Sequence, residues 1–323
     1  MNNLEKIVLV ASASLVIGLS AAVFWPKPEV VVVDIRTVRI GQIGKSVSYA
    51  PLYVAKKNGK FEEAFSEYGY KVEYITYADG AEANSALLND QVDVVFQSDI
   101  VPAIVAKSQK LPIFIANVSC TYVEEIMIPT DSTIKTIEEM RDRKIIVKQN
   151  SSNHYNLRKS LAVAGVNPND YATVEMTTRE SIAAIKNMEV DGWASNSPYT
   201  ELGELSRYMR PLPKGEAKAY SIVVVRDAFK AQKAKAFVDL LNVIDEVKIW
   251  IPFNEITAVT ITAEELEMPV EVIRKAFFRH NWGMKLNESA VNIMQPFADF
   301  LREEKVIDDA VDIRGTLIKT NLD

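Results

Sequence analysis

The sequence predicts an α/β protein with two lobes, a cleft between them and a helical C-terminal third. Short apolar runs, several with period-two alternation, recur between amphipathic segments, which is typical of strands that alternate with helices. This alternation occurs in two successive series, and from Asp227 onward the periodicity is almost wholly helical. The length of 323 residues agrees with this division, because it suffices for about two domains that each bury a core.

The first series, residues 29–125, is expected to form most of the first lobe. β-Branched residues between Glu29 and Ile40 predict its first strand, and the alternating segment Lys71–Tyr77 predicts the second. The other elements expected in this series are helices over 81–88 and 101–107 and strands over 92–96 and 113–118.

The second series, residues 126–220, is expected to form the second lobe. Short polar connections join its elements, which favours parallel strands covered by helices. The apolar run Tyr220–Val225 is expected to return the chain to the first lobe, which residues 221–323 complete. The expected strands are 144–148, 171–176 and 190–194, and the expected helices are 137–141, 153–164, 181–188, 228–250, 263–266, 270–278 and 289–304.

Residues 1–28 contain the one long apolar stretch, Ile7–Trp25, between Lys6 and Pro26. One interpretation is a signal peptide that is cleaved near the small residues 20–22. The other is an uncleaved anchor, because the stretch approaches the roughly 20 residues that span a bilayer. Both interpretations place the rest of the chain in the periplasm or at the extracytoplasmic face of the cytoplasmic membrane.

Composition argues against several classes of protein. The net charge of −6 and the absence of a long basic run argue against a nucleic-acid partner. One cysteine and two histidines exclude an internal disulfide and argue against a Cys/His zinc site. No cofactor is indicated, and Cys120 is expected to be a small packed residue. No G-x-S-x-G or P-loop motif appears, so no catalytic residues are proposed.

Several motifs then occur in an order typical of one family. The segment Val47–Phe61, VSYAPLYVAKKNGKF, resembles the opening of the nitrate/sulfonate/taurine family of ABC-importer binding proteins, which includes aliphatic-sulfonate and pyrimidine-precursor-like members. The resemblance covers roughly residues 34–310. Further similar segments follow in the family's order, namely 79–83 (DGAEA), 92–95 (VDVV), 140–145 (MRDRKI), 150–152 (NSS) and 190–198 (VDGWASNSP).

This resemblance implies a type II periplasmic-binding-protein fold with crossovers near Glu124–Ile128 and Tyr220–Val225. It also implies a solute-binding protein that captures a small polar or anionic molecule, such as a sulfonate, taurine or nitrate. Its partners would be an ABC permease and that permease's ATPase. Two departures alter the pocket: Asn196-Ser197-Pro198 stands where the family has Trp-Glu-Pro, and Asn150 replaces a glycine. Ligand identity is therefore not carried over.

The candidate ligand-binding residues share a position where a predicted strand ends or the next helix begins. Loops at the carboxyl ends of strands converge in open α/β lobes, and the free N–H groups of helix N-termini favour anionic or strongly polar groups. These candidates are Ser46, Tyr49, Gly80, Ala81, Ser98, Asp99, Ser119, Tyr122, Ser151, Ser152, Asn153 and Asn196.

Several candidates keep a second interpretation open. The serines can be plain helix N-caps, and Tyr49 can either stack on a ligand or pack at the hinge. Strand parity puts Trp193 and Asn196 on different sides, and the family position favours Asn196 for the cleft. Among the acidic pairs, Glu124-Glu125 at the crossover is singled out as the one that could leave the solvated surface and face a cationic group.

Two other functions fit the same predicted fold. One is a membrane-anchored sensor or scaffold, which retention of the apolar N-terminal segment would favour. The other is an enzyme resembling pyrimidine-precursor synthases or menaquinone-pathway enzymes. The synthases usually carry a cysteine-rich motif, which is absent here.

Overall fold

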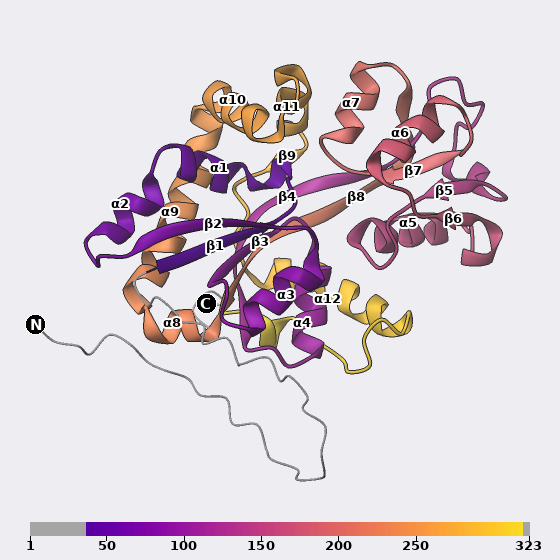
Figure 1. Ribbon diagram of the computed structural model, residues 1–323. Helices are drawn as coiled ribbons and strands as arrows, with labels where there is room; N and C mark the ends of the chain where they lie inside the picture. Colours follow the sequence, from indigo (N-terminus) through magenta and orange to yellow (C-terminus); the bar gives the residue numbers. More distant parts are fainter. Residues whose placement is uncertain (1–36, 319–323) are drawn as a thin grey trace, which may run out of the picture.

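The computed structural model describes residues 37–318, and one mixed sheet of nine strands extends through this part of the chain (Figure 1). The strands are β1 (Thr37–Ile43), β2 (Lys71–Tyr77), β3 (Val94–Gln97), β4 (Ile113–Pro129), β5 (Lys144–Ile146), β6 (Ala172–Val174), β7 (Gly192–Ser195), β8 (Met209–Arg226) and β9 (His280–Asn281). Their order in the sheet is β2-β1-β3-β8-β4-β7-β5-β6, and β9 pairs with β4. The expected N-terminal segment, 1–28, and most of the expected strand 29–40 lie outside the described residues.

The long antiparallel strands β4 and β8 join two lobes. In the first lobe, residues 37–118 and 222–318, β8 pairs with β3 through Ile222–Val225. In the second lobe, residues 125–217, β4 pairs with β7 from Glu125. The change of lobe therefore lies inside two continuous strands, where residues 119–124 of β4 lie beside residues 217–221 of β8.

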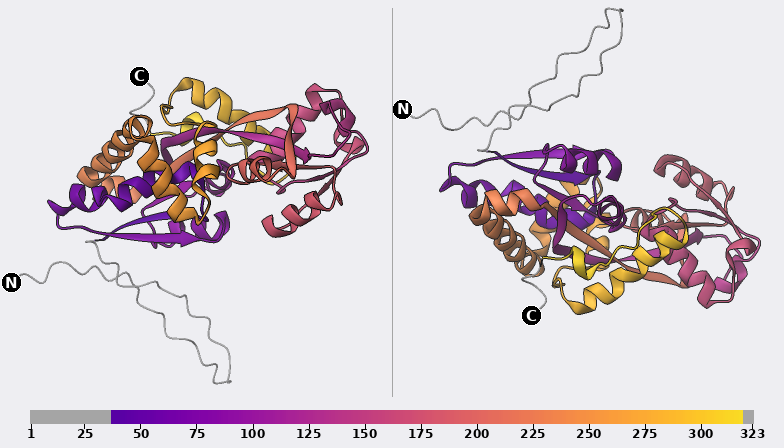
Figure 2. Two further views of the ribbon diagram at one scale, coloured as in Figure 1. Left: turned by 90° about the horizontal axis from the view of Figure 1, so that it is seen from above. Right: turned by 90° about the horizontal axis from the view of Figure 1, so that it is seen from below.

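Helices cover both faces of the sheet in the first lobe. On one side α1 and α2 pack with α9 and α10, and on the other side α3 and α4 lie near α12 (Figures 1 and 2). The bounds are α1 (Ala50–Lys57), α2 (Lys60–Ser66), α3 (Gly80–Leu88), α4 (Val101–Ser108), α8 (Asp227–Gln232), α9 (Ala234–Phe253), α10 (Glu255–Leu266), α11 (Val270–Phe277) and α12 (Glu288–Glu303). Within residues 37–318, no helix combines the length and the apolar character that crossing a membrane requires.

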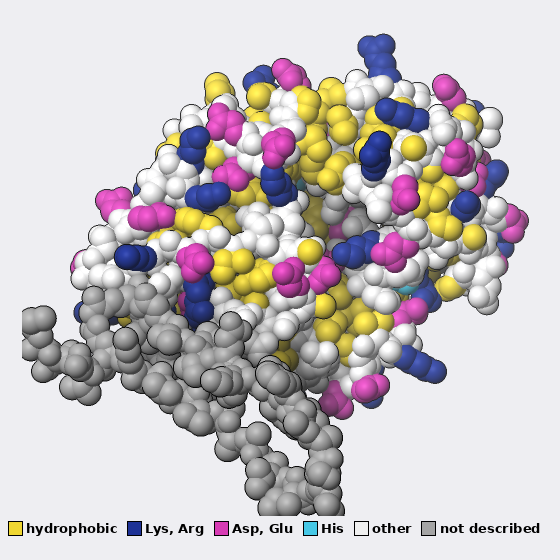
Figure 3. All heavy atoms as spheres, viewed as in Figure 1, with side chains coloured by type: hydrophobic (Ala, Val, Ile, Leu, Met, Phe, Trp, Pro, Cys, Tyr) yellow, Lys and Arg dark blue, Asp and Glu magenta, His cyan; other side chains and the backbone are white. Residues whose placement is uncertain are grey.

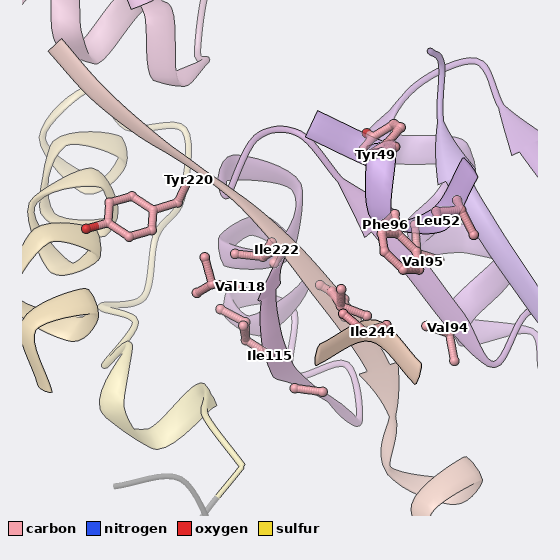
Figure 4. Close-up of a cluster of buried hydrophobic side chains, with 14 of the residues drawn as sticks. Tyr49, Leu52, Val94, Val95, Phe96, Ile115, Val118, Tyr220, Ile222 and Ile244 are labelled. Atoms are coloured by element: carbon pink, nitrogen blue, oxygen red, sulfur yellow. The ribbon is translucent and has the colours of Figure 1, made fainter. Parts of the chain in front are cut away.

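The core of the first lobe lies between these helices and the sheet. Figure 4 shows Tyr49 and Leu52 gathered around Phe96, while Ile115 and Ile222 form a neighbouring group on the long strands. Tyr49 meets Phe96 edge to face at 6.3 Å between ring centroids. Each large apolar side chain buried in this way stabilises the fold by about 1.5–3 kcal/mol.

The second lobe is smaller and has a separate core on each face of its sheet. Its strands β5, β6 and β7 run parallel, so their carboxyl ends meet at one edge. The helices are α5 (Ser152–Val163), α6 (Thr178–Lys186) and α7 (Tyr199–Leu205), and short 3-10 turns occur in both lobes at 47–49, 137–140, 168–170 and 314–316.

The structure differs from the expected elements in several places, and it contains α7 and β9, which the sequence did not predict. Strands β4 and β8 extend far beyond the expected 113–118 and 220–225. The expected helix 137–141 is a 3-10 turn. The expected helix 228–250 is two helices that meet at Lys233, whose side chain turns inward to lie 3.9 Å from the carboxylate of Asp93.

Candidate functional site

A polar cavity lies at the edge of the second lobe where β5, β6 and β7 end. Its volume is about 220 Å³. The N-terminal ends of α5, α6 and α7 all contribute to its lining, so peptide dipoles converge on it. The space-filling view shows the surface hollowed between the two lobes (Figure 3). The strand-end cavity is lined by Ile146, Lys148, Asn153, Glu175, Met176, Thr178, Ser181, Trp193, Ala194, Ser195, Asn196 and Tyr199.

Aromatic, charged and amide groups give this cavity the means to hold a small molecule. Trp193 and Tyr199 stack with ring centroids 6.1 Å apart, forming an apolar wall. Lys148 and Glu175 supply opposite charges. The amide Nδ2 of Asn153 is buried and has no hydrogen-bond partner within the described residues. A buried donor without a partner is costly, so the cavity favours a ligand that carries an acceptor.

A second polar group, the cleft network, connects the two lobes beside this cavity. Asp99, in the loop after β3, accepts a hydrogen bond from the backbone N–H of Ser152 at 3.0 Å. The Ser152 hydroxyl donates to Glu124 Oε1 at 2.5 Å, and the Asn156 amide donates to Oε2. The network consists of Ser98, Asp99, Tyr122, Glu124, Ser152 and Asn156, and Tyr122 donates its hydroxyl to the Ser98 carbonyl at 2.6 Å.

Burial changes the acidity of this network. Removal from water raises the pKa of Glu124 to about 8, and the nearby negative charge of Asp99 adds to this rise. Burial also raises the pKa of Asp99, although the N–H groups of Ser152 and Val101 and the charge of Lys148 oppose that rise. At neutral pH the Glu124 carboxyl therefore retains a proton, and two adjacent buried carboxylates are avoided.

This raised pKa predicts a dependence of stability on pH. The folded state retains the Glu124 proton up to about pH 8, whereas the unfolded chain loses it near the ordinary value of 4.5. Between these limits the folded state binds more protons, so the free energy of unfolding falls as pH rises, by up to ~1.4 kcal/mol per pH unit. Glu124→Gln removes this contribution, and its stability relative to the wild type should increase from pH 5 to pH 8 in thermal unfolding.

The control for this prediction is Glu216→Gln, which changes an exposed carboxylate on β8. It should leave the shape of the pH profile unchanged. Parallel profiles for Glu124→Gln and the wild type would show that the Glu124 proton does not contribute.

The structure separates the predicted ligand residues into three groups. Asn153 and Asn196 line the strand-end cavity. Ser98, Asp99, Tyr122 and Ser152 belong to the cleft network. The remaining candidates, which have capping or packing roles or lie outside both groups, are Ser46, Tyr49, Gly80, Ala81, Ser119 and Ser151.

Tyr49 and Ser119 belong to the core rather than to a ligand surface. Both are 0% exposed. The Tyr49 hydroxyl donates to the Ile43 carbonyl and accepts from the Ser98 N–H, so its hydrogen-bonding capacity is already used. The Ser119 hydroxyl donates to the Ser48 carbonyl at 2.8 Å.

The serine and glycine candidates serve the local backbone. Ser46 and Ser151 are N-caps whose side chains accept from the N–H groups of Ser48 and His154. At Gly80 an added Cβ would lie 2.7 Å from the Pro102 ring, so this glycine permits close packing of α3 on α4. The neighbouring Ala81 is exposed and lines neither the cavity nor the network.

The sequence interpretation missed several residues of the site. Lys148 and Glu175 follow strands and Ser195 is the last residue of one, so the rule that found Asn153 could have found them. Trp193 and Asn196 both line the cavity, although strand parity had separated them. The chain leaves the extended conformation after Ser195, and parity therefore stops being informative there.

Ser48 and His280 form a buried serine–histidine pair. The Ser48 hydroxyl lies 3.3 Å from Nε2 of His280, and Nδ1 lies 2.8 Å from the Ala276 carbonyl. Nδ1 therefore carries the proton and Nε2 accepts from the serine. Burial lowers the pKa of His280 to about 4. Both side chains are buried, and neither lines the strand-end cavity.

An ion-pair cluster, the Arg279 clasp, joins the lobes on another side. Arg279 follows α11 in the first lobe and contacts Glu201 at 3.0 Å and Glu204 at 2.9 Å on α7 of the second lobe. It also lies 3.1 Å from Glu125 on β4. Within residues 37–318, no group of three or more His, Cys, Asp or Glu side chains is arranged to hold a metal ion.

This chain is similar to named relatives and to proteins of known structure. A Bacillus subtilis (strain 168) protein named for binding aliphatic sulfonates is 24% identical over 295 residues, which cover 89% of this chain and 88% of the relative. The solved periplasmic aliphatic sulphonate binding protein SsuA of Escherichia coli has a TM-score of 0.79 at 20% identity, covering 88% of this chain and 98% of that one. The desulfurization enzyme DszB has a TM-score of 0.66 at 12% identity, covering 88% and 96%.

These likenesses confirm the expected type II periplasmic-binding-protein fold. At such low identities the structural matches show only that the fold is shared. They include a binding protein and an enzyme. The family model described as "NMT1/THI5 like" matches residues 46–246, which is more than half of the chain. The chain therefore belongs to the NMT1/THI5-like family.

Proposed function

We propose that this chain is the solute-binding component of an ABC importer and holds a small polar molecule in the strand-end cavity. The proposal places the protein outside the cytoplasm, with a permease and its ATPase as partners. The observation that carries it is the cavity itself, where the N-terminal ends of three helices, an aromatic wall and the unpartnered Nδ2 of Asn153 converge. Concave sites with a few convergent polar groups are the usual form of small-molecule sites.

The relatives support this proposal over catalysis. The curated relatives that match are named as binding proteins. Proteins with the periplasmic-binding fold generally close around a ligand by a hinge motion of their domains. Cys120 is buried, and burial raises its thiol pKa to about 12, which removes it as a nucleophile at neutral pH. The Ser48–His280 pair does not line the cavity, so this pair does not reach the place where a ligand would sit.

Thermal-shift screening of the purified protein tests the proposal. The panel holds taurine, alkanesulfonates, nitrate, bicarbonate, neutral heterocycles and small organic cations. A ligand at 100 times its Kd adds about 2.7 kcal/mol to stability, so one compound should raise the melting temperature. The double variant Asn153→Ala, Asn196→Ala should bind that compound about tenfold or more weakly, because each amide can hydrogen-bond to the ligand.

A matched control is Asn89→Ala, which truncates an exposed asparagine at the end of α3. It should bind the compound as the wild type does. If no compound of any charge shifts the wild type, the solute-binding proposal fails and an anchored sensor or scaffold becomes the better account.

A further inference from the structure

The N-terminus of α5 already holds a carboxylate that belongs to the protein. Asp99 of the first lobe places Oδ2 3.0 Å from the backbone nitrogen of Ser152, the first residue of α5. Its other oxygen accepts from the Val101 N–H at 2.9 Å. Asp99 thus contacts the first lobe through one oxygen and the second lobe through the other. An anionic ligand group would seek the same N–H and the same helix dipole.

The donors next to this position are also in use. The Ser152 hydroxyl and the Asn156 amide donate to Glu124, and the Tyr122 hydroxyl lies 2.6 Å from the Ser98 carbonyl. A sulfonate entering between the lobes here would meet the Asp99 and Glu124 carboxyls, with the Ser152 and Asn156 side-chain donors already engaged. It would have to displace Asp99 or lie beside a like charge, which is unfavourable in a site sheltered from water.

We propose that Asp99 determines specificity by excluding anionic groups from the N-terminus of α5, so that the solute is neutral or cationic rather than a sulfonate. This inference rests on the proposed solute-binding function. The relatives named for sulfonates are only 24% identical to this chain, a distance at which a ligand class can change. The strand-end cavity agrees with the inference, because its charges, Lys148 and Glu175, offset each other. Asn153 Nδ2 still offers a hydrogen bond to a neutral acceptor.

The test compares binding of methanesulfonate and butanesulfonate by the wild type, Asp99→Asn and Asp99→Ser, using calorimetry and the fluorescence of the tryptophans. Asp99→Asn removes the charge and keeps the shape, whereas Asp99→Ser also frees the Ser152 N–H. We expect weak or no binding by the wild type and at least about tenfold tighter binding by one or both variants, because a like charge at the anion position has been removed.

Asp79→Asn is the matched control. Asp79 caps α3 in the first lobe by accepting from the Glu82 N–H, but it contributes to neither the network nor the cavity. Asp79→Asn should bind the sulfonates no more tightly than the wild type does. A melting temperature for each variant establishes that it is folded before binding is measured.

The outcomes separate this inference from the proposed function. Equal sulfonate binding by the wild type and by both Asp99 variants would overturn the role of Asp99 and leave the solute-binding function standing. Folded Asp99 variants that gain no sulfonate binding would also overturn it. A gain limited to the Asp99 variants would support it, whichever compound of the broader panel binds the wild type.

Discussion

Replacing Asp93 by asparagine is expected to lower the free energy of unfolding by about 3–5 kcal/mol, because it removes the negative charge from a buried cluster of cations. Asp93 is 1% exposed. Its carboxylate lies 3.2 Å from the Arg39 guanidinium and 2.8 Å from that of Arg226, and the Lys233 ammonium is 3.9 Å away. Arg226 is itself buried, so water cannot replace the lost partner.

Asp90→Asn provides the matched control for this prediction. Asp90 also contacts Arg226, but its side chain is 52% exposed. It has a positive φ of 57°, a conformation that asparagine tolerates well. Its loss should cost no more than about 1 kcal/mol. Guanidinium-induced unfolding of both variants measures the difference, and equal stabilities would mean that the cluster does not depend on Asp93.

The position of this cluster explains a part of the fold that the sequence could not predict. The segment 92–96 was expected to be a buried strand, and its apolar residues are indeed buried in and beside β3. The local sequence did not indicate which cations would pair with Asp93, the single acidic residue in this segment. Arg226 and Lys233 are more than 130 residues away along the chain and meet Asp93 only after β8 has returned to the first lobe.

The long strands show where local patterns stop being informative. Ile113–Val118 is apolar except for Asn117, and Ser119, Thr121 and Glu124 interrupt the pattern that would extend it. The structure continues β4 through these residues. The Ser119 hydroxyl donates to the Ser48 carbonyl, and Glu124 accepts from the Ser152 hydroxyl. β8 also contains Pro211 and Pro213, residues that a regular strand disfavours. They are accommodated where the register of β4 and β8 shifts, between Glu125 and Met127.

The candidate site was predictable only in part, for a similar reason. The rule that polar residues gather where parallel strands end found Asn153, Asn196 and Ser152. It could not show that Asp99 would occupy the N-terminus of α5, because that contact depends on how the two lobes meet. Glu124-Glu125 was singled out at the crossover, and the structure buries Glu124 in the cleft network and places Glu125 in the Arg279 clasp.

Replacing Arg279 by methionine should separate the lobes and cost about 3–5 kcal/mol of stability, because it leaves three carboxylates around a site without their cation. Glu201 is 0% exposed and cannot turn to water. Burial opposes the charge on Arg279, but Glu125, Glu201 and Glu204 outweigh that effect and raise its pKa. The arginine is therefore held charged by groups from both lobes.

The expected results are a lower melting temperature and a larger radius of gyration in small-angle X-ray scattering. The loss of stability in Arg279→Met should become smaller as pH falls. Burial already raises the pKa of Glu125 and Glu201, and their protonation removes the repulsion between the two carboxylates. Lys275→Met is the matched control, since Lys275 also pairs with Glu204 at 3.0 Å but is 36% exposed. It should cost less than about 1 kcal/mol. If Arg279→Met were as stable and compact as Lys275→Met, the clasp would not hold the lobes together, and the cleft network would be left as the main polar connection between them.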